Sequence, residues 1–167
     1  MIDTTEILQT LQRLDTEYNV YISDPEMPIF FSKLAVMEFC GWIEMSFDSI
    51  LKDYIQSHIV DDRCKKIIEG FIRKNSGFAY ETNTFQIFSI VLGANNWENI
   101  LDVIPDKEKV DFKNTLQEYS EIRNVAAHTN TAGTTSTYKA PSEVIKAFQL
   151  FLPAIQKIET EVRKLPL

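Results

Sequence analysis

This chain has few of the side chains that build metal sites and covalent cross-links. Its 167 residues include only two cysteines and two histidines. No CxxC pair and no Glu-x-x-His spacing occurs, which argues against zinc and di-iron sites, so we expect no metal and no other cofactor. Cys40 and Cys64 fall in segments with a helical pattern, and the sequence therefore predicts reduced thiols and a cytoplasmic location.

Long apolar runs are absent as well. No segment reaches the roughly 18 uninterrupted apolar residues that a membrane-spanning helix needs. The N-terminal residues 1–6 lack the basic start and apolar run of a signal peptide. With 44% apolar residues and this length, we expect a single domain over residues 1–167 with a sizeable core that needs no disulfide.

Positive charge is scarce and unevenly placed. The net charge of −7 repels phosphate unless the cations are focused. Five of them crowd one stretch: Arg63, Lys65, Lys66, Arg73 and Lys74. A solvent-exposed helix face is the simpler interpretation of this cluster, and a track for phosphate groups is the alternative.

The apolar spacing is helical throughout and predicts an all-α fold. The first helix should follow the possible caps Asp3 and Thr4. After a break at residues 24–28, the longest pattern runs from about residue 29 to residue 59. Its middle, residues 34–43, is apolar on nearly all sides, which predicts burial in a bundle centre or a subunit interface. Gly41 within it should let another helix approach closely.

Further helices follow with shorter patterns. Asp61 or Asp62 can cap a helix that ends at residues 75–77, an apolar block covers residues 85–92, and a short piece covers residues 97–104 after a break at residues 93–96. Asp106 can start the next helix, and Pro141 can open the last one, which Pro153 should bend. Four residues of the third helix should share a buried stripe (Ile67, Ile68, Phe71 and Ile72), as should five of the helix after Asp106 (Val110, Phe112, Leu116, Tyr119 and Ile122).

The most informative motif is Arg123-Asn124-Val125-Ala126-Ala127-His128. Arginine is a permanent cation whose planar fork fits a phosphate, and histidine moves protons near neutral pH. Five helical positions turn by about 500°, so Arg123 and His128 lie about 140° apart on a straight helix, whereas Asn124 and His128 share a face. For both to reach one substrate, the helix must end or bend near His128, or a second chain must complete the site. The polar run 129–137 favours a loop after the histidine.

A purely structural interpretation of this motif is also open. Arg123 could pair with Glu118 or reach Tyr119 on the preceding turn. His128 could be an ordinary residue at a helix end, where a cation suits the helix dipole.

The motif nevertheless resembles that of the HEPN superfamily, small all-α domains of toxin–antitoxin and anti-phage systems. The resemblance rests on the sequence EIRNVAAHTN at residues 121–130, on its position late in a helix before a loop and a final helix, and on the upstream long helix at residues 33–55. That helix is similar to the first core helix of HEPN domains near the RiboL-PSP group. Thr129 follows His128 where many relatives have glycine.

The resemblance implies a HEPN-like helical bundle with additional short helices and a metal-independent endoribonuclease. It implies a homodimer in which the motifs of two chains face one cleft. Arg123 would then hold the scissile phosphate, His128 would act as general acid or base, and Asn124 would orient His128 or touch phosphate. RNA would be the substrate, and a cognate antitoxin or defence-system protein a further partner. The alternative is a non-catalytic HEPN dimer that serves as an assembly module, or a helical bundle unrelated to either.

Other polar residues have two interpretations each. Glu38, Glu44 and Asp48 lie on the long helix, either on a solvent face or near the cleft, where a carboxylate could position Arg123. Tyr138 could reach the cleft from the loop or pack on the surface. His58 has no partner motif, and we expect it to be structural.

Overall fold

The structure is a computed structural model that describes residues 2–75, 77–129 and 138–166. These residues form helices joined by short connections and contain no strand, which confirms the all-α prediction. In chain order the elements are α1 (Thr5–Val20), α2 (Met27–His58), α3 (Asp62–Lys74), the single π-helical turn η1 (Tyr80–Thr84), α4 (Phe85–Leu92), α5 (Ala94–Asp102), α6 (Asp106–His128) and α7 (Pro141–Val162).

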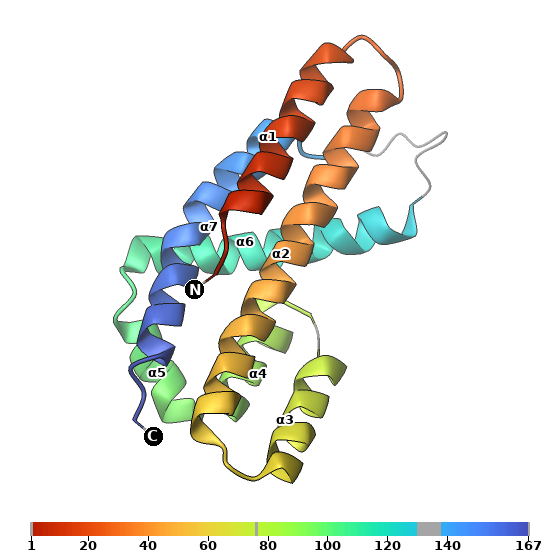
Figure 1. Cartoon of the computed structure of the whole chain (residues 1–167). Coiled ribbons are helices and arrows are strands. Elements are labelled where there is room, and N and C mark those ends of the chain that lie inside the picture. Colours follow the sequence, from red (N-terminus) through yellow and green to blue (C-terminus); the bar gives the residue numbers. More distant parts are fainter. Residues whose placement is uncertain (1, 76, 130–137, 167) are drawn as a thin grey trace.

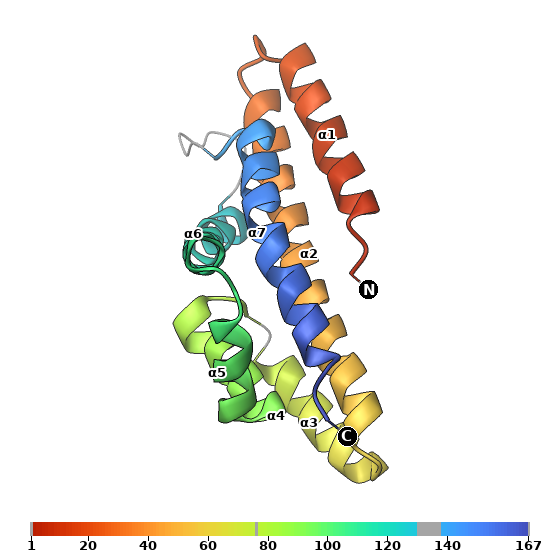
Figure 2. The same cartoon turned by 90° about the vertical axis from the view of Figure 1, so that its left-hand side faces the viewer.

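Helix α2 is the longest of the helices in the described chain, and most of the others pack against it (Figure 1). Helices α1 and α7 pack along it and against each other, and α6 crosses both α2 and α7 (Figures 1 and 2). The shorter helices α3, α4 and α5 gather at the end of α2 opposite the α1–α2 connection. Helix α2 contacts α1, α3, α4, α6 and α7. Its apolar middle is therefore buried in a bundle centre, which is one of the two environments predicted for it.

Aromatic side chains fill the junction where α6 crosses α2 and α7. The Phe112 and Phe151 rings stack with centroids 5.0 Å apart. The Phe39 ring meets the edge of the Tyr119 ring at 4.9 Å. All four are fully buried, and aromatic pairs of this kind add to the free energy gained by burial alone. This junction fixes the position of α6, and α6 carries the motif.

Several predicted helix ends are confirmed, but the break before α2 is shorter than predicted. Helix α2 already begins at Met27, and Pro28 lies in its first turn, where a missing N–H costs nothing. Asp61 caps α3 by accepting from the backbone N–H groups of Arg63 and Cys64. Helix α6 begins at Asp106 and α7 at Pro141, and α7 continues through Pro153.

Other predictions about packing are wrong. Ile67 is 71% exposed and Val110 is 54% exposed, so neither belongs to a buried stripe. A Cβ atom added to Gly41 would have no described atom within 4 Å, so no other described helix approaches closely there. The break before α5 is Gly93 alone, with φ of +90°, and the helix already starts at Ala94.

None of the helices in the described part of the chain combines the length and hydrophobicity that crossing a bilayer requires.

Candidate functional site

The motif occupies the last turns of α6. The helix ends at His128, and Thr129 is extended, with φ of −107° and ψ of 128°. The helix therefore stops directly after the histidine, but it is regular from Arg123 to His128, so these two side chains keep the angular separation of a straight helix. The side chains of Asn124 and His128 are exposed, and that of Arg123 is partly exposed.

Arg123 is held by a carboxylate on the neighbouring helix. Its Nη2 lies 3.3 Å from Oε1 of Glu44 on α2, and the two side chains are 38% and 29% exposed. The expected alternative, a pair between Arg123 and Glu118, is wrong, because Glu118 pairs with Lys139 instead. The ion pair uses one terminal nitrogen of Arg123, and the remaining donors of its partly exposed fork are open to a second anion.

The surroundings of this pair are partly desolvated. Burial raises the pKa of Glu44, and the neighbouring Asp48 raises it further, while Arg123 opposes both effects. One turn earlier on α2, burial raises the pKa of the Cys40 thiol to about 12, with a further contribution from Glu44. Cys40 is therefore a protonated core residue, whose Sγ lies 3.6 Å from the carbonyl oxygen of Tyr119, and not a nucleophile.

The end of α6 is fastened by a residue that the sequence did not single out. Lys33, in the second turn of α2, donates from Nζ to the carbonyl oxygen of Thr129. The Thr129 hydroxyl donates back to the carbonyl oxygen of Val125 at 2.7 Å. A cation suits a helix C-terminus, where carbonyl groups lack intrahelical partners. Lys33 thus places a positive charge next to His128. In the sequence, the only signal for this role of Lys33 is its position near the start of the long helix.

A groove of about 280 Å³ adjoins the ion pair. Glu44 and Asp48 line it from α2, and Asn75 and Gly77 line it from the segment after α3. Asp48 in turn pairs with Lys52, 3.1 Å away. Each of the two carboxylates that line the groove from α2 therefore has a cationic partner, which is Arg123 for Glu44 and Lys52 for Asp48.

The structure brings some predicted residues together and leaves others apart. Glu44 meets Arg123, as the second interpretation of that carboxylate stated, whereas Glu38 is exposed. Within the described chain, no side-chain hydrogen bond joins Arg123, Asn124 and His128 to one another. Arg123 turns toward α2, and Asn124 and His128 turn away from it. This agrees with their angular separation on a straight helix.

The remaining candidates are less involved. His58 is structural in its contacts: its ring stacks on Tyr54 with centroids 4.1 Å apart, and its nitrogens lie 3.0 Å and 3.2 Å from the carbonyl oxygens of Tyr54 and Leu165. The Tyr138 hydroxyl is buried and has no hydrogen-bond partner among the described residues. The polar run after Thr129 lies outside the described residues. In the part that is described, no three His, Cys, Asp or Glu side chains lie close enough to share a metal ion.

Comparison with known proteins adds no relative. No protein-family model matches the chain, and no curated protein or solved structure matches it significantly. A function for the site must therefore be argued from its own residues and from the motif resemblance.

Proposed function

We propose that this protein is a metal-independent endoribonuclease of the HEPN type, acting in the cytoplasm as a toxin or anti-phage effector. Arg123 binds and neutralises the scissile phosphate. His128 acts as general acid or base on the ribose 2′-OH or on the leaving 5′-oxygen. Asn124, one turn before His128 on the same exposed face of α6, orients the imidazole or contacts phosphate.

One observation carries the proposal. Arg123 is not on an open surface or buried in a closed salt bridge but partly exposed, with Glu44 on one terminal nitrogen. A guanidinium that pairs with a carboxylate through one nitrogen and stays partly exposed can bind a phosphate with little further loss of side-chain freedom. A purely structural ion pair has no need of an exposed histidine at the adjoining helix end.

The proposal requires two chains, because one chain aims Arg123 and His128 in different directions. The exposed face of α6 supplies a surface on which a second copy could pack, since Val125, beside Asn124, is 51% exposed. In such a dimer, the partner chain would have to supply the Arg123 that acts with the His128 of the first chain. The composite site is the same arrangement that the motif resemblance implies.

The alternative is a non-catalytic dimer that serves as an assembly module, and the acidic composition favours it. The intact Arg–Asn–His set favours the enzyme. A cognate antitoxin or defence-system protein belongs to both versions of the proposal.

The test is incubation of the purified protein with mixed cellular RNA, in parallel with Arg123→Ala and His128→Ala. Both variants should lose cleavage by about 10²-fold or more, because each removes a group that acts on the transition state. Arg13→Ala, which removes an exposed arginine on α1, is the matched control and should cleave normally. Equal activity of all four proteins would identify a contaminating nuclease and contradict the proposal.

The products report the chemistry. With the ribose 2′-OH as nucleophile, its proton passes to a base, the 5′-oxygen leaves with a proton, and the fragments carry a 2′,3′-cyclic phosphate and a 5′-hydroxyl. Cleavage should continue in excess chelator, and a 2′-deoxyribose at the scissile position should block it. Cleavage of the deoxy substrate, or a strict requirement for Mg²⁺, would contradict this mechanism.

A further inference from the structure

Helix α3 presents an outer face of cations that nothing in the described chain neutralises. Lys66, Arg73 and Lys74 are exposed, and none of their side chains makes a hydrogen bond or ion pair with another described residue. Lys66 and Arg73 are seven residues apart and therefore differ by only about 20° around the helix, and Lys74 lies within about 100° of both. The chain has a net charge of −7, so the positive charge of this face is opposite in sign to that of the molecule as a whole.

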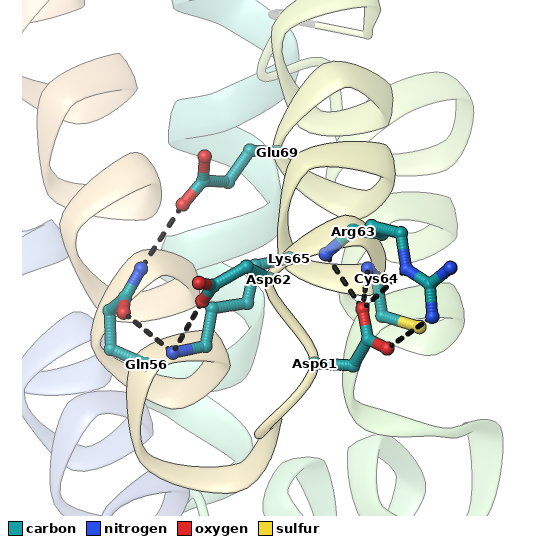
Figure 3. A network of polar contacts seen from close by, with 7 residues as sticks. All are labelled: Gln56, Asp61, Asp62, Arg63, Cys64, Lys65 and Glu69. Atoms are coloured by element: carbon teal, nitrogen blue, oxygen red, sulfur yellow. Dashed lines mark hydrogen bonds and ion pairs between the residues drawn. The ribbon is translucent and has the colours of Figure 1, made fainter.

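The other two cations of the cluster are used within the structure. Figure 3 shows Arg63 against Asp61, with Nη2 3.0 Å from Oδ2, and Lys65 against Gln56 and Asp62. Lys65 thus helps to fasten α3 to α2. Two cations of the cluster therefore pair with other described residues, and the side chains of the remaining three do not.

The free cations surround an open stretch of backbone. Gly70 lies between Lys66 and Lys74, four residues from each, and a Cβ atom added there would have no described atom within 4 Å. Ile67 on the same face is 71% exposed. A negatively charged chain could therefore approach the helix closely at Gly70, with the cationic side chains on both sides of it and the apolar side chain of Ile67 beside it.

This face leads to the candidate site. Helix α3 ends at Lys74, and the next residue, Asn75, lines the groove whose opposite wall carries Glu44, the partner of Arg123. A strand that follows the outer face of α3 past Lys74 therefore reaches a groove whose lining includes Glu44, the ion-pair partner of Arg123. Helix α3 lies at one end of the molecule (Figure 1), and its three free cations are exposed.

We infer that Lys66, Arg73 and Lys74 form the surface that binds the phosphate backbone of single-stranded RNA and leads it to Arg123. The inference rests on the proposed function. Charge complementarity favours a polyanion, and the groove that Asn75 and Glu44, the partner of Arg123, both line favours a substrate strand over an acidic protein. Contacts to phosphate alone carry no base preference, so this surface contributes affinity and not sequence selection.

The test uses a fluorescent 2′-O-methyl RNA 20-mer, whose blocked 2′-oxygens prevent cleavage, so that binding is measured on the intact protein whether or not it is a nuclease. Anisotropy at increasing KCl should show the unmodified chain binding with a salt-dependent Kd. The variant Lys66→Ala/Arg73→Ala/Lys74→Ala should bind at least about 10-fold more weakly near 100 mM KCl. Its slope of log K against log salt should be smaller in magnitude by about 2, since each lost contact to a single strand removes about 0.7.

The matched control is Arg13→Ala/Lys107→Ala/Lys146→Ala, which removes three exposed cations from other helices and so changes the net charge equally. It should bind almost as the unmodified chain does. Equal weakening of both triple variants, or no binding of the 20-mer at all, would overturn the inference. Equally tight binding of polyglutamate or of phosphatidylserine vesicles through the same three residues would also overturn it, by assigning the face to an acidic protein or a membrane. RNA binding without cleavage of unmodified RNA would contradict only the proposed nuclease.

Discussion

Arg123 and Glu44 form a partly exposed ion pair between two helices, and Glu44 acts on the proposed chemistry only through Arg123. Glu44→Ala leaves the guanidinium free to move and should lower RNA cleavage by about 10- to 100-fold. Glu44→Gln should restore part of the activity, because its amide oxygen can accept the same hydrogen bond. Initial rates on one oligonucleotide measure both effects.

Glu38→Ala is the control for this series, because it removes an exposed carboxylate from the same helix. It should cleave as the unmodified chain does. If Glu44→Ala were fully active, Arg123 would need no positioning and the ion pair would be structural only.

The raised pKa of Glu44 also predicts a dependence of stability on pH. A raised pKa means that the folded chain holds the proton more tightly than the unfolded chain, so the stabilisation is complete below the ordinary pKa of glutamate and is lost as the pH rises through the raised value. Glu44→Gln cannot lose this proton. Thermal melts from about pH 4 to about pH 7 should therefore show the variant gaining stability relative to the unmodified chain. The opposite trend would show that the pairing with Arg123 outweighs burial.

His128 differs from Arg123 in that it is exposed at a helix end. His128→Ala should abolish most cleavage, by about 10²- to 10⁴-fold, and should change the free energy of unfolding by no more than about 1 kcal/mol. Urea unfolding and cleavage assays on the same preparation separate the two effects. Asn114→Ala, on the same exposed face of α6, is the control. A large loss of stability in His128→Ala would make the histidine a packing residue.

Helix α3 has little buried surface to stabilise it. It buries only Ile72 completely and leaves Ile67 exposed, so its N-terminal cap matters more than it would in a well-buried helix. Hydrogen bonds from the Arg63 side chain and from the backbone N–H groups of Arg63 and Cys64 lower the pKa of Asp61. The cap is therefore complete above the ordinary pKa of aspartate and is lost as the pH falls through the lowered value.

Asp61→Ala should consequently speed amide hydrogen exchange throughout α3 while leaving α1 and α7 unchanged. Exchange followed by mass spectrometry on peptides from residues 60–75 measures this. Asp62→Ala removes the neighbouring carboxylate and not the cap, so it should have a smaller effect. Equal exchange in both variants would show that α3 is held by its packing on α2 and not by the cap.

At the scale of the whole molecule, the proposed chemistry requires two chains, because α6 aims Arg123 and His128 to different sides. Light scattering at low micromolar concentration should give about twice the chain mass of 19.3 kDa. Mixing Arg123→Ala with His128→Ala should then restore some cleavage, since one of the two composite sites in the mixed dimer keeps both residues. A monomer that still cleaves RNA would contradict the composite site.

The helices and their approximate ends can be predicted from the amino-acid sequence. Apolar spacing, prolines and aspartate caps act over a few residues, so they can be read without knowing the partners of each helix. The sequence also determines that Arg123 and His128 diverge, because five helical steps fix that angle whatever surrounds the helix.

Which charged side chains pair with each other depends on how the helices pack. Arg123 pairs with Glu44, which is 79 positions away in the chain, and not with nearby Glu118, because α6 crosses α2 at that point. The exposure of Ile67 and Val110 and the open space beside Gly41 were likewise hidden, because a helical period shows which residues share a face but not whether another helix covers that face. The contact of Lys33 with the end of α6 has the same origin, since it depends on where two distant helices cross.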